Sequence, residues 1–154
     1  MSQNSSNGSS SRTHSDLRHA ISSWKPIILI AEDDSDSREM MQLLLETRGF
    51  NVVSAENGIR ALEVALQVKP DAVLIDLELP KLDGLSVTRN LRLHPAFNTL
   101  PIVIVSGHDP SRYRRDALDA GCDEYLLKPI NFDRLHELLD RLVTAERRAL
   151  VKSA

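Results

Sequence analysis

The sequence contains one cysteine, Cys122, only 4% aromatic residues and no long apolar run. A single cysteine cannot form a disulfide within the chain, and it cannot supply the roughly four ligands of a structural zinc site. No stretch approaches the roughly 18 apolar residues needed to cross a bilayer, and the N-terminal residues lack the apolar core of a signal peptide. We therefore expect a soluble, cytoplasmic protein that does not associate with membranes.

A large excess of either charge is also missing. The chain has 19 Lys and Arg residues against 22 Asp and Glu residues, which gives a formal net charge of -3 at pH 7. This balance provides no overall attraction to nucleic acid. Basic residues late in the chain, such as Arg147 and Arg148, alternate with acidic ones as on a solvated helix face, and no helix-turn-helix segment is visible. We expect no direct contact with nucleic acid.

The length and the distribution of apolar residues indicate one folded domain. The 154 residues are 42% hydrophobic, which suits a single globular core. Residues 1–24 are dominated by Ser, Asn and Gly, which predicts a flexible N-terminal tail. Leu17, Ile21 and Trp24 leave open a short docked helix there. We place the domain at 25–148 and a C-terminal tail at 149–154.

Alternating short apolar runs and helical patterns indicate the fold class. The apolar runs are too short for helices and rich in residues that suit strands buried on both faces. Helical spacing separates them, and Asp36 with Glu39 resembles a capping box at the start of the first helix. This alternation predicts an α/β fold with a parallel sheet covered by helices on both faces. The predicted strands are 27–31, 51–55, 72–75, 102–105 and 125–127, and the last helix starts near Asn131.

Polar residues directly follow four of these strands. The carboxyl ends of parallel strands meet at one edge of the sheet, which is where ligands bind in open α/β sheets. Neighbouring carboxylates oppose each other's ionisation unless a cation lies between them. Oxygen ligands of this kind suit Mg²⁺, for which Mn²⁺ can substitute. The residues are Glu32 with Asp33, then Asp76, Ser106 and Lys128.

This combination of residues fits phosphoryl transfer to a carboxylate. Asp76 is the best placed nucleophile, since a carboxylate beside a cation can attack phosphorus and form an acyl phosphate. The transferred group then carries charge on its equatorial oxygens. The metal, the Lys128 ammonium and the Ser106 hydroxyl with nearby backbone N–H groups can each neutralise one of these oxygens.

Four motifs carry a family resemblance. They are Ile-Ala-Glu-Asp-Asp at 30–34, Leu-Ile-Asp-Leu-Glu-Leu-Pro-Lys-Leu-Asp-Gly at 74–84, Ile-Val-Ser-Gly at 104–107 and Tyr-Leu-Leu-Lys-Pro at 125–129. Each motif is weak alone, but together and in this order they are specific. From about residue 25 to residue 143, the chain resembles the receiver domain of two-component response regulators.

The resemblance implies a fold and a set of site residues. The fold is a flavodoxin-like, doubly wound, five-stranded parallel sheet of order 2-1-3-4-5 with five helices. Asp76 accepts the phosphoryl group, and Ser106 and Lys128 assist the transfer. The Mg²⁺ ligands are Glu32, Asp33, Asp76 and the backbone carbonyl of Glu78. Ser106 and Tyr125 form the switch pair, and the Lys128–Pro129 peptide bond is cis.

The resemblance also implies the biological role. The chain is expected to act as a stand-alone phosphoaccepting switch that receives its phosphoryl group from a histidine kinase or a histidine phosphotransfer protein. It is not an enzyme apart from catalysing its own phosphorylation and dephosphorylation. Its signal passes to a downstream protein target, and a homodimer through the last helices is left open. Glu78 and His108 occupy positions that tune the lifetime of the phosphorylated state in this family.

Two other functions and several local alternatives stay open. A Mg²⁺-dependent phosphohydrolase with an aspartyl-phosphate intermediate uses the same groups, and the fold also suits a phosphate-independent interaction module. We interpret Asp34 as a helix cap or as a residue that supports the metal ligands, and His108 as an exposed loop residue. Neither is interpreted as a metal ligand. Asp83 and Gly84 are typical of a turn in which Gly supplies a positive φ.

Overall fold

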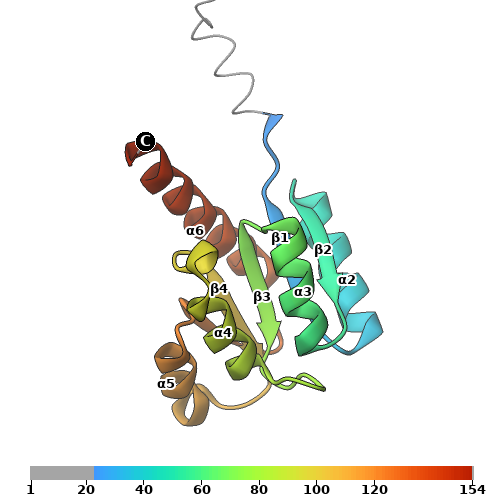
Figure 1. The fold of residues 1–154 in the computed structure, drawn as a ribbon. Helices are drawn as coiled ribbons and strands as arrows, with labels where there is room; N and C mark the ends of the chain where they lie inside the picture. The colour runs from blue at the N-terminus through green and yellow to red at the C-terminus, as the bar shows by residue number, and fades with distance from the viewer. Residues whose placement is uncertain (1–22, 154) are drawn as a thin grey trace, which may run out of the picture.

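The computed structural model describes residues 23–153, so the predicted tail before residue 23 lies outside the described residues. Its five strands form one parallel sheet of order β2-β1-β3-β4-β5 (Figure 1). The predicted doubly wound, flavodoxin-like order 2-1-3-4-5 is therefore confirmed. The strands are β1 (Ile27–Ala31), β2 (Asn51–Ala55), β3 (Ala72–Asp76), β4 (Ile102–Ser106) and β5 (Glu124–Leu127).

Helices cover both faces of this sheet, because successive side chains of a strand point to opposite faces. In β1, Leu29 faces the layer built by α3, α4 and α5, whereas Ile28 and Ile30 face α2 and α6. The two apolar cores are therefore separated by the sheet. Within residues 23–153 the helices are α2 (Ser35–Thr47), α3 (Gly58–Val68), α4 (Gly84–Leu93), α5 (Pro110–Ala120) and α6 (Phe132–Lys152), with a 3₁₀ turn at Pro95–Phe97.

Helix ends follow the predicted signals at most positions. Asp109 caps α5 with Pro110 at its first position, and Asn131 caps α6 by accepting a hydrogen bond from the Arg134 amide. The capping box predicted at Asp36 is wrong. Asp34 has extended backbone angles, so its carboxylate reaches the Ser37 amide at 2.8 Å and the helix already begins at Ser35.

The last helix extends past the sheet (Figure 1). It spans 21 residues and ends at Lys152, so its last turn falls in the region predicted as a C-terminal tail. Trp24 lies against this helix, with its ring centroid 3.9 Å from the Arg147 guanidinium carbon. None of the helices described between residues 23 and 153 has both the length and the apolar character needed to span a membrane.

Truncating Leu139 tests the core beneath α6. This side chain is fully buried, so Leu139→Ala should lower the free energy of unfolding by about 2–5 kcal/mol, because it leaves a cavity against the sheet. Leu93→Ala is the matched control, since Leu93 is 82% exposed and its truncation should change stability by less than about 0.5 kcal/mol. Urea unfolding followed by circular dichroism measures both. Equal losses in the two variants would contradict the assigned packing.

Candidate functional site

The strand register brings the predicted polar residues to one edge of the sheet. Ala31 pairs with Ile75, so the next residues, Glu32 and Asp76, lie on neighbouring strands at the same level. Ser106 pairs with Leu127 in the same way. Lys128 follows Leu127 directly, and its amide donates a hydrogen bond of 2.8 Å to the Ser106 carbonyl. Parallel pairing alone therefore assembles residues that are up to 96 positions apart in the chain.

Three carboxylates gather at this edge. One oxygen from each of Glu32, Asp33 and Asp76 lies within 4.8 Å of the others. Glu32 is 2% exposed and Asp76 9% exposed, whereas Asp33 is exposed to solvent. Hard oxygen donors clustered this tightly, with an open side toward water, fit a Mg²⁺ ion that retains some of its water ligands.

The electrostatics of Glu32 also fit a cation site. Burial, followed by the hydrogen bond to Asp76 and the negative charge of Asp76, raises the pKa of Glu32 from 4.5 to about 7. The charge and hydrogen bond of Lys128 act in the opposite direction and offset this only in part. A bound divalent cation favours the ionised form of all three carboxylates and removes this conflict.

Lys128 forms ion pairs with both buried carboxylates. Its ammonium donates to Asp76 Oδ2 at 2.7 Å and to Glu32 Oε2 at 3.2 Å. Burial acts to lower the pKa of Lys128, but the hydrogen bonds and charges of Asp76 and Glu32 outweigh this and raise it. The side chain is therefore a full positive charge at neutral pH. The Lys128–Pro129 peptide bond is cis, as the resemblance implied.

The loop after β3 orients Asp76. The amide of Glu78 donates to Asp76 Oδ1 at 2.9 Å, and the loop folds back so that the Gly84 amide donates to the Leu77 carbonyl. The predicted positive φ at Gly84 is wrong. Glycine is needed there because an added Cβ would lie 2.4 Å from the Asp76 carbonyl oxygen, and the loop's positive φ occurs at Lys81 instead.

His108 links the predicted switch residues. Its amide donates to Ser106 Oγ at 3.0 Å, and its carbonyl accepts from the Tyr125 hydroxyl at 2.9 Å. The ring contacts Tyr113 with a centroid distance of 5.0 Å, and Nε2 contacts a carboxylate oxygen of Glu78. His108 lies in a loop, as the sequence interpretation had it, and 41% of its side chain is exposed while these contacts hold its ring against the loop after β3.

The predicted residues thus form two adjoining groups. Glu32, Asp33, Asp76 and Lys128 contact or closely approach one another, and Ser106 with Tyr125 adjoin them through His108. The contact between Glu78 and His108 was not foreseen, since each residue lies in a separate loop and no local pattern relates them. The same applies to Arg38, whose guanidinium donates to the backbone carbonyls of Glu32 and Asp33.

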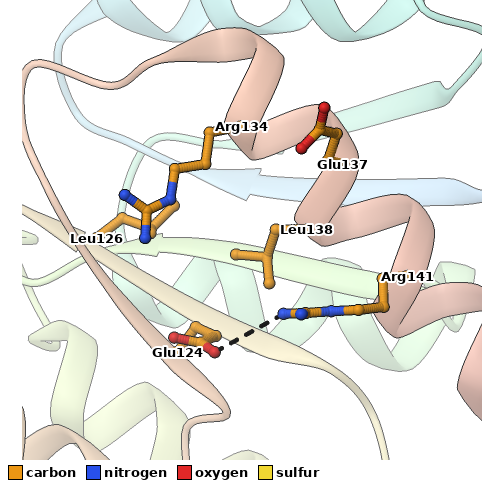
Figure 2. A pocket seen from close by; sticks show the side chains of 6 residues that line it. All are labelled: Glu124, Leu126, Arg134, Glu137, Leu138 and Arg141. Atoms are coloured by element: carbon orange, nitrogen blue, oxygen red, sulfur yellow. Dashed lines mark ion pairs between the residues drawn. The ribbon is translucent and has the colours of Figure 1, made fainter.

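A second, shallow hollow lies away from this site, between β5 and α6. Side chains from the strand and the helix extend toward each other around it, and Arg141 approaches Glu124 at 4.0 Å (Figure 2). Both signs of charge surround two apolar side chains. The lining residues are Glu124, Leu126, Arg134, Glu137, Leu138 and Arg141.

Comparison with known proteins identifies the family. Residues 28–140 match the family model described as the response regulator receiver domain. The chain belongs to this family. As a receiver domain of two-component response regulators it is a signalling domain, and this family assignment does not favour the phosphohydrolase.

Curated relatives of this receiver domain are response regulators. Response regulator MprA from Mycobacterium sp. (strain KMS) is 40% identical over 121 residues, which is 79% of this chain and 50% of that protein. MprA from Mycobacterium leprae (strain TN) is also 40% identical over 121 residues, covering 79% of this chain and 51% of that protein. The chain therefore spans about half the length of the curated relatives it matches.

A solved structure adds information on the metal. The receiver domain of the sensor histidine kinase PA1611 from Pseudomonas aeruginosa PAO1 superposes with a TM-score of 0.73 at 30% identity, over 79% of this chain and 99% of that one. It has a magnesium ion coordinated in its active site cleft. A putative response regulator from Chloroflexus aurantiacus J-10-fl gives a TM-score of 0.75, also at 30% identity and with the same coverage.

The raised pKa of Glu32 predicts a pH dependence of stability in metal-free receiver protein. Between pH 4.5 and about 7 the folded protein keeps a proton that the unfolded chain releases, so the contribution of Glu32 to stability falls as the pH rises. Above about pH 7 this contribution levels off. Glu32→Gln should remove this pH-dependent contribution to the free energy of unfolding, whereas Glu39→Gln, at an exposed position, should not.

Urea unfolding in EDTA across this pH range measures the effect. The free energy of unfolding of the wild type minus that of Glu32→Gln should decrease as the pH rises. A difference that is independent of pH would contradict the assigned environment of Glu32.

Proposed function

We propose that Asp76 of this receiver accepts a phosphoryl group in a Mg²⁺-dependent reaction. The Mg²⁺ ligands are Glu32, Asp33, Asp76 and the backbone carbonyl of Glu78, and Mn²⁺ can replace Mg²⁺. The observation that carries the proposal is the hydrogen bond from Lys128 to Asp76, at 2.7 Å, in the middle of the carboxylate cluster. A nucleophile, a set of cation ligands and an ammonium group thus share one small volume.

The reaction makes one bond and breaks one. A carboxylate oxygen of Asp76 attacks phosphorus, and the bond from phosphorus to the histidine nitrogen of the donor breaks, with the nitrogen keeping the electron pair. The Glu78 amide, which donates to Asp76 Oδ1, and the Lys128 ammonium orient the attacking carboxylate. When bound, Mg²⁺ supplies positive charge for one phosphoryl oxygen. Lys128 and the Ser106 hydroxyl are then the donors for others.

The switch follows from the hydrogen bonds of His108. Ser106 Oγ accepts from the His108 amide, so a Ser106 hydroxyl that turns toward the phosphoryl group gives up this bond. The loop then loses one of its anchors, and the bond from the Tyr125 hydroxyl to the His108 carbonyl is weakened. Phosphorylation at Asp76 is thereby transmitted to Tyr125 on β5 and to the surface near it.

Partners bind at two different surfaces. A histidine kinase or a histidine phosphotransfer protein donates the phosphoryl group, and a largely apolar groove along α2 and the loop after β5 adjoins Lys128. The downstream protein target binds the face built by α5, β5 and α6, which includes the hollow of Figure 2. Mixed charge around its apolar centre also suits a second copy, and a homodimer through α6 is one arrangement of this surface.

Phosphorylation by acetyl phosphate tests the assignment of Asp76. Incubation with acetyl phosphate and Mg²⁺ should add one phosphoryl group per chain, and Asp76→Asn should abolish this addition because it removes the nucleophile. Asp116→Asn, an exposed substitution on α5, should be labelled like the wild type. Intact-mass spectrometry measures the labelling. Continued release of phosphate over many turnovers would instead support the phosphohydrolase, and no labelling would support the phosphate-independent module.

Neutralising Lys128 should separate metal binding from transfer. Lys128→Met removes a charge that opposes Mg²⁺, so Mg²⁺ affinity should be retained or increased, while the rate of labelling by acetyl phosphate should fall roughly 100-fold. Lys25→Met, an exposed substitution before β1, is the control and should change neither quantity. Isothermal titration calorimetry and time-resolved intact mass give the two quantities. Loss of Mg²⁺ binding in Lys128→Met would contradict the role given to this ammonium.

A further inference from the structure

Arg38 contacts the backbone of the acidic turn, which is the segment from Glu32 to Asp34 that follows β1. It lies in the first turns of α2 and is half-buried. Its Nη1 donates to the backbone carbonyl of Glu32 at 2.9 Å and to that of Asp33 at 3.3 Å. These carbonyls belong to the two residues whose side chains extend toward Asp76. The guanidinium thus holds the backbone of the acidic pair without contacting its carboxylates.

The acidic turn requires this support because it lies beyond the end of β1. The Glu32 amide still donates to the Ala55 carbonyl of β2 at 3.1 Å, which fixes the start of the turn. Beyond this point the Asp34 amide donates to the carboxylate of Glu32, and the Asp34 carboxylate is used to cap α2. The direction of the Glu32 and Asp33 side chains depends on the orientation of the peptide units between these anchors. Arg38 fixes those peptide units through their carbonyl oxygens.

The two cations near the acidic cluster act on different atoms. Lys128 donates to the carboxylate oxygens of Glu32 and Asp76, which are atoms that a metal ion needs as ligands. Arg38 bonds to carbonyl oxygens instead, so its contacts do not have to break when a cation binds.

We propose that Arg38 is a positioning residue of the Mg²⁺ site, acting through the backbone carbonyls of Glu32 and Asp33. This inference rests on the proposed function, because it assumes that the acidic cluster binds Mg²⁺. Removal of a residue that orients metal ligands in this way commonly lowers the metal affinity 10–100-fold. Arginine suits the role because one nitrogen of its planar group carries two hydrogens, one for each carbonyl.

Calorimetric titration of the full chain with MgCl₂ tests the proposal. Arg38→Met should bind Mg²⁺ roughly 10-fold more weakly than the wild type. Arg60→Met is the matched control, since Arg60 is an exposed arginine of α3 that pairs with Glu63 of its own helix, and its affinity should equal that of the wild type. Arg38→Lys keeps a hydrogen-bond donor but lacks the planar group that reaches both carbonyls, so it should recover only part of the loss. Wild-type affinity in Arg38→Met or Arg38→Lys would overturn the proposal.

Thermal unfolding in EDTA and in Mg²⁺ separates positioning from a general structural role. If Arg38 positions the metal ligands, Arg38→Met should reduce the increase in Tm that Mg²⁺ produces. If Arg38 has only a structural role, Arg38→Met should lower Tm by the same amount in EDTA and in Mg²⁺, and this result would overturn the proposal. If Arg38→Met lacks a cooperative transition, Arg38→Lys decides the outcome. Asp33→Asn distinguishes a failure of the Arg38 inference from a failure of the proposed Mg²⁺ site. If Asp33→Asn binds Mg²⁺ as the wild type does, or if the wild type does not bind Mg²⁺, the proposed site is wrong. The inference about Arg38 is then wrong as well.

Discussion

The attraction between Lys128 and the paired carboxylates of Glu32 and Asp76 is the interaction on which the site depends. Like charges are packed against each other in largely buried positions, and burial together with Asp76 raises the pKa of Glu32 to about 7. The ammonium group of Lys128 offsets this rise in pKa only in part. The acidic cluster is therefore electrostatically unbalanced as built from protein groups, and a divalent cation would restore the balance.

A rigid frame is needed to hold such a cluster, and the sheet provides it. The central strands β3 and β4 are buried along their entire length, so their ends are fixed by packing on both faces. The functional side chains then extend from the last strand residues and the first loop residues. Arg38 adds a further constraint at the acidic turn, where ladder hydrogen bonds end. Rigid strands and short, anchored loops together set the geometry to which a ligand binds.

The contacts of His108 connect the edge of the sheet that bears the site to the outer surface of the domain. One residue bonds to Ser106 at the site and to Tyr125 on β5, while its ring lies beside Tyr113 of α5. These contacts therefore link Ser106 to two elements of the surface that we propose for downstream partners. The contact of His108 with Glu78 joins the same loop to the one that orients Asp76.

Sequence alone determined the strands, the apolar faces of the helices and the candidate residues, because burial on two faces and helical periodicity leave local patterns. The strand order was implied by the family resemblance and not by these patterns. It misplaced the first helix cap at Asp36 and misjudged Gly84, where close approach to the Asp76 carbonyl rather than φ requires glycine. Only the tertiary structure decided the contacts of Arg38 and the pairing of His108 with Glu78. These contacts join loops or backbone atoms whose approach depends on the packing of separate strands and helices, and no pattern within either segment encodes it.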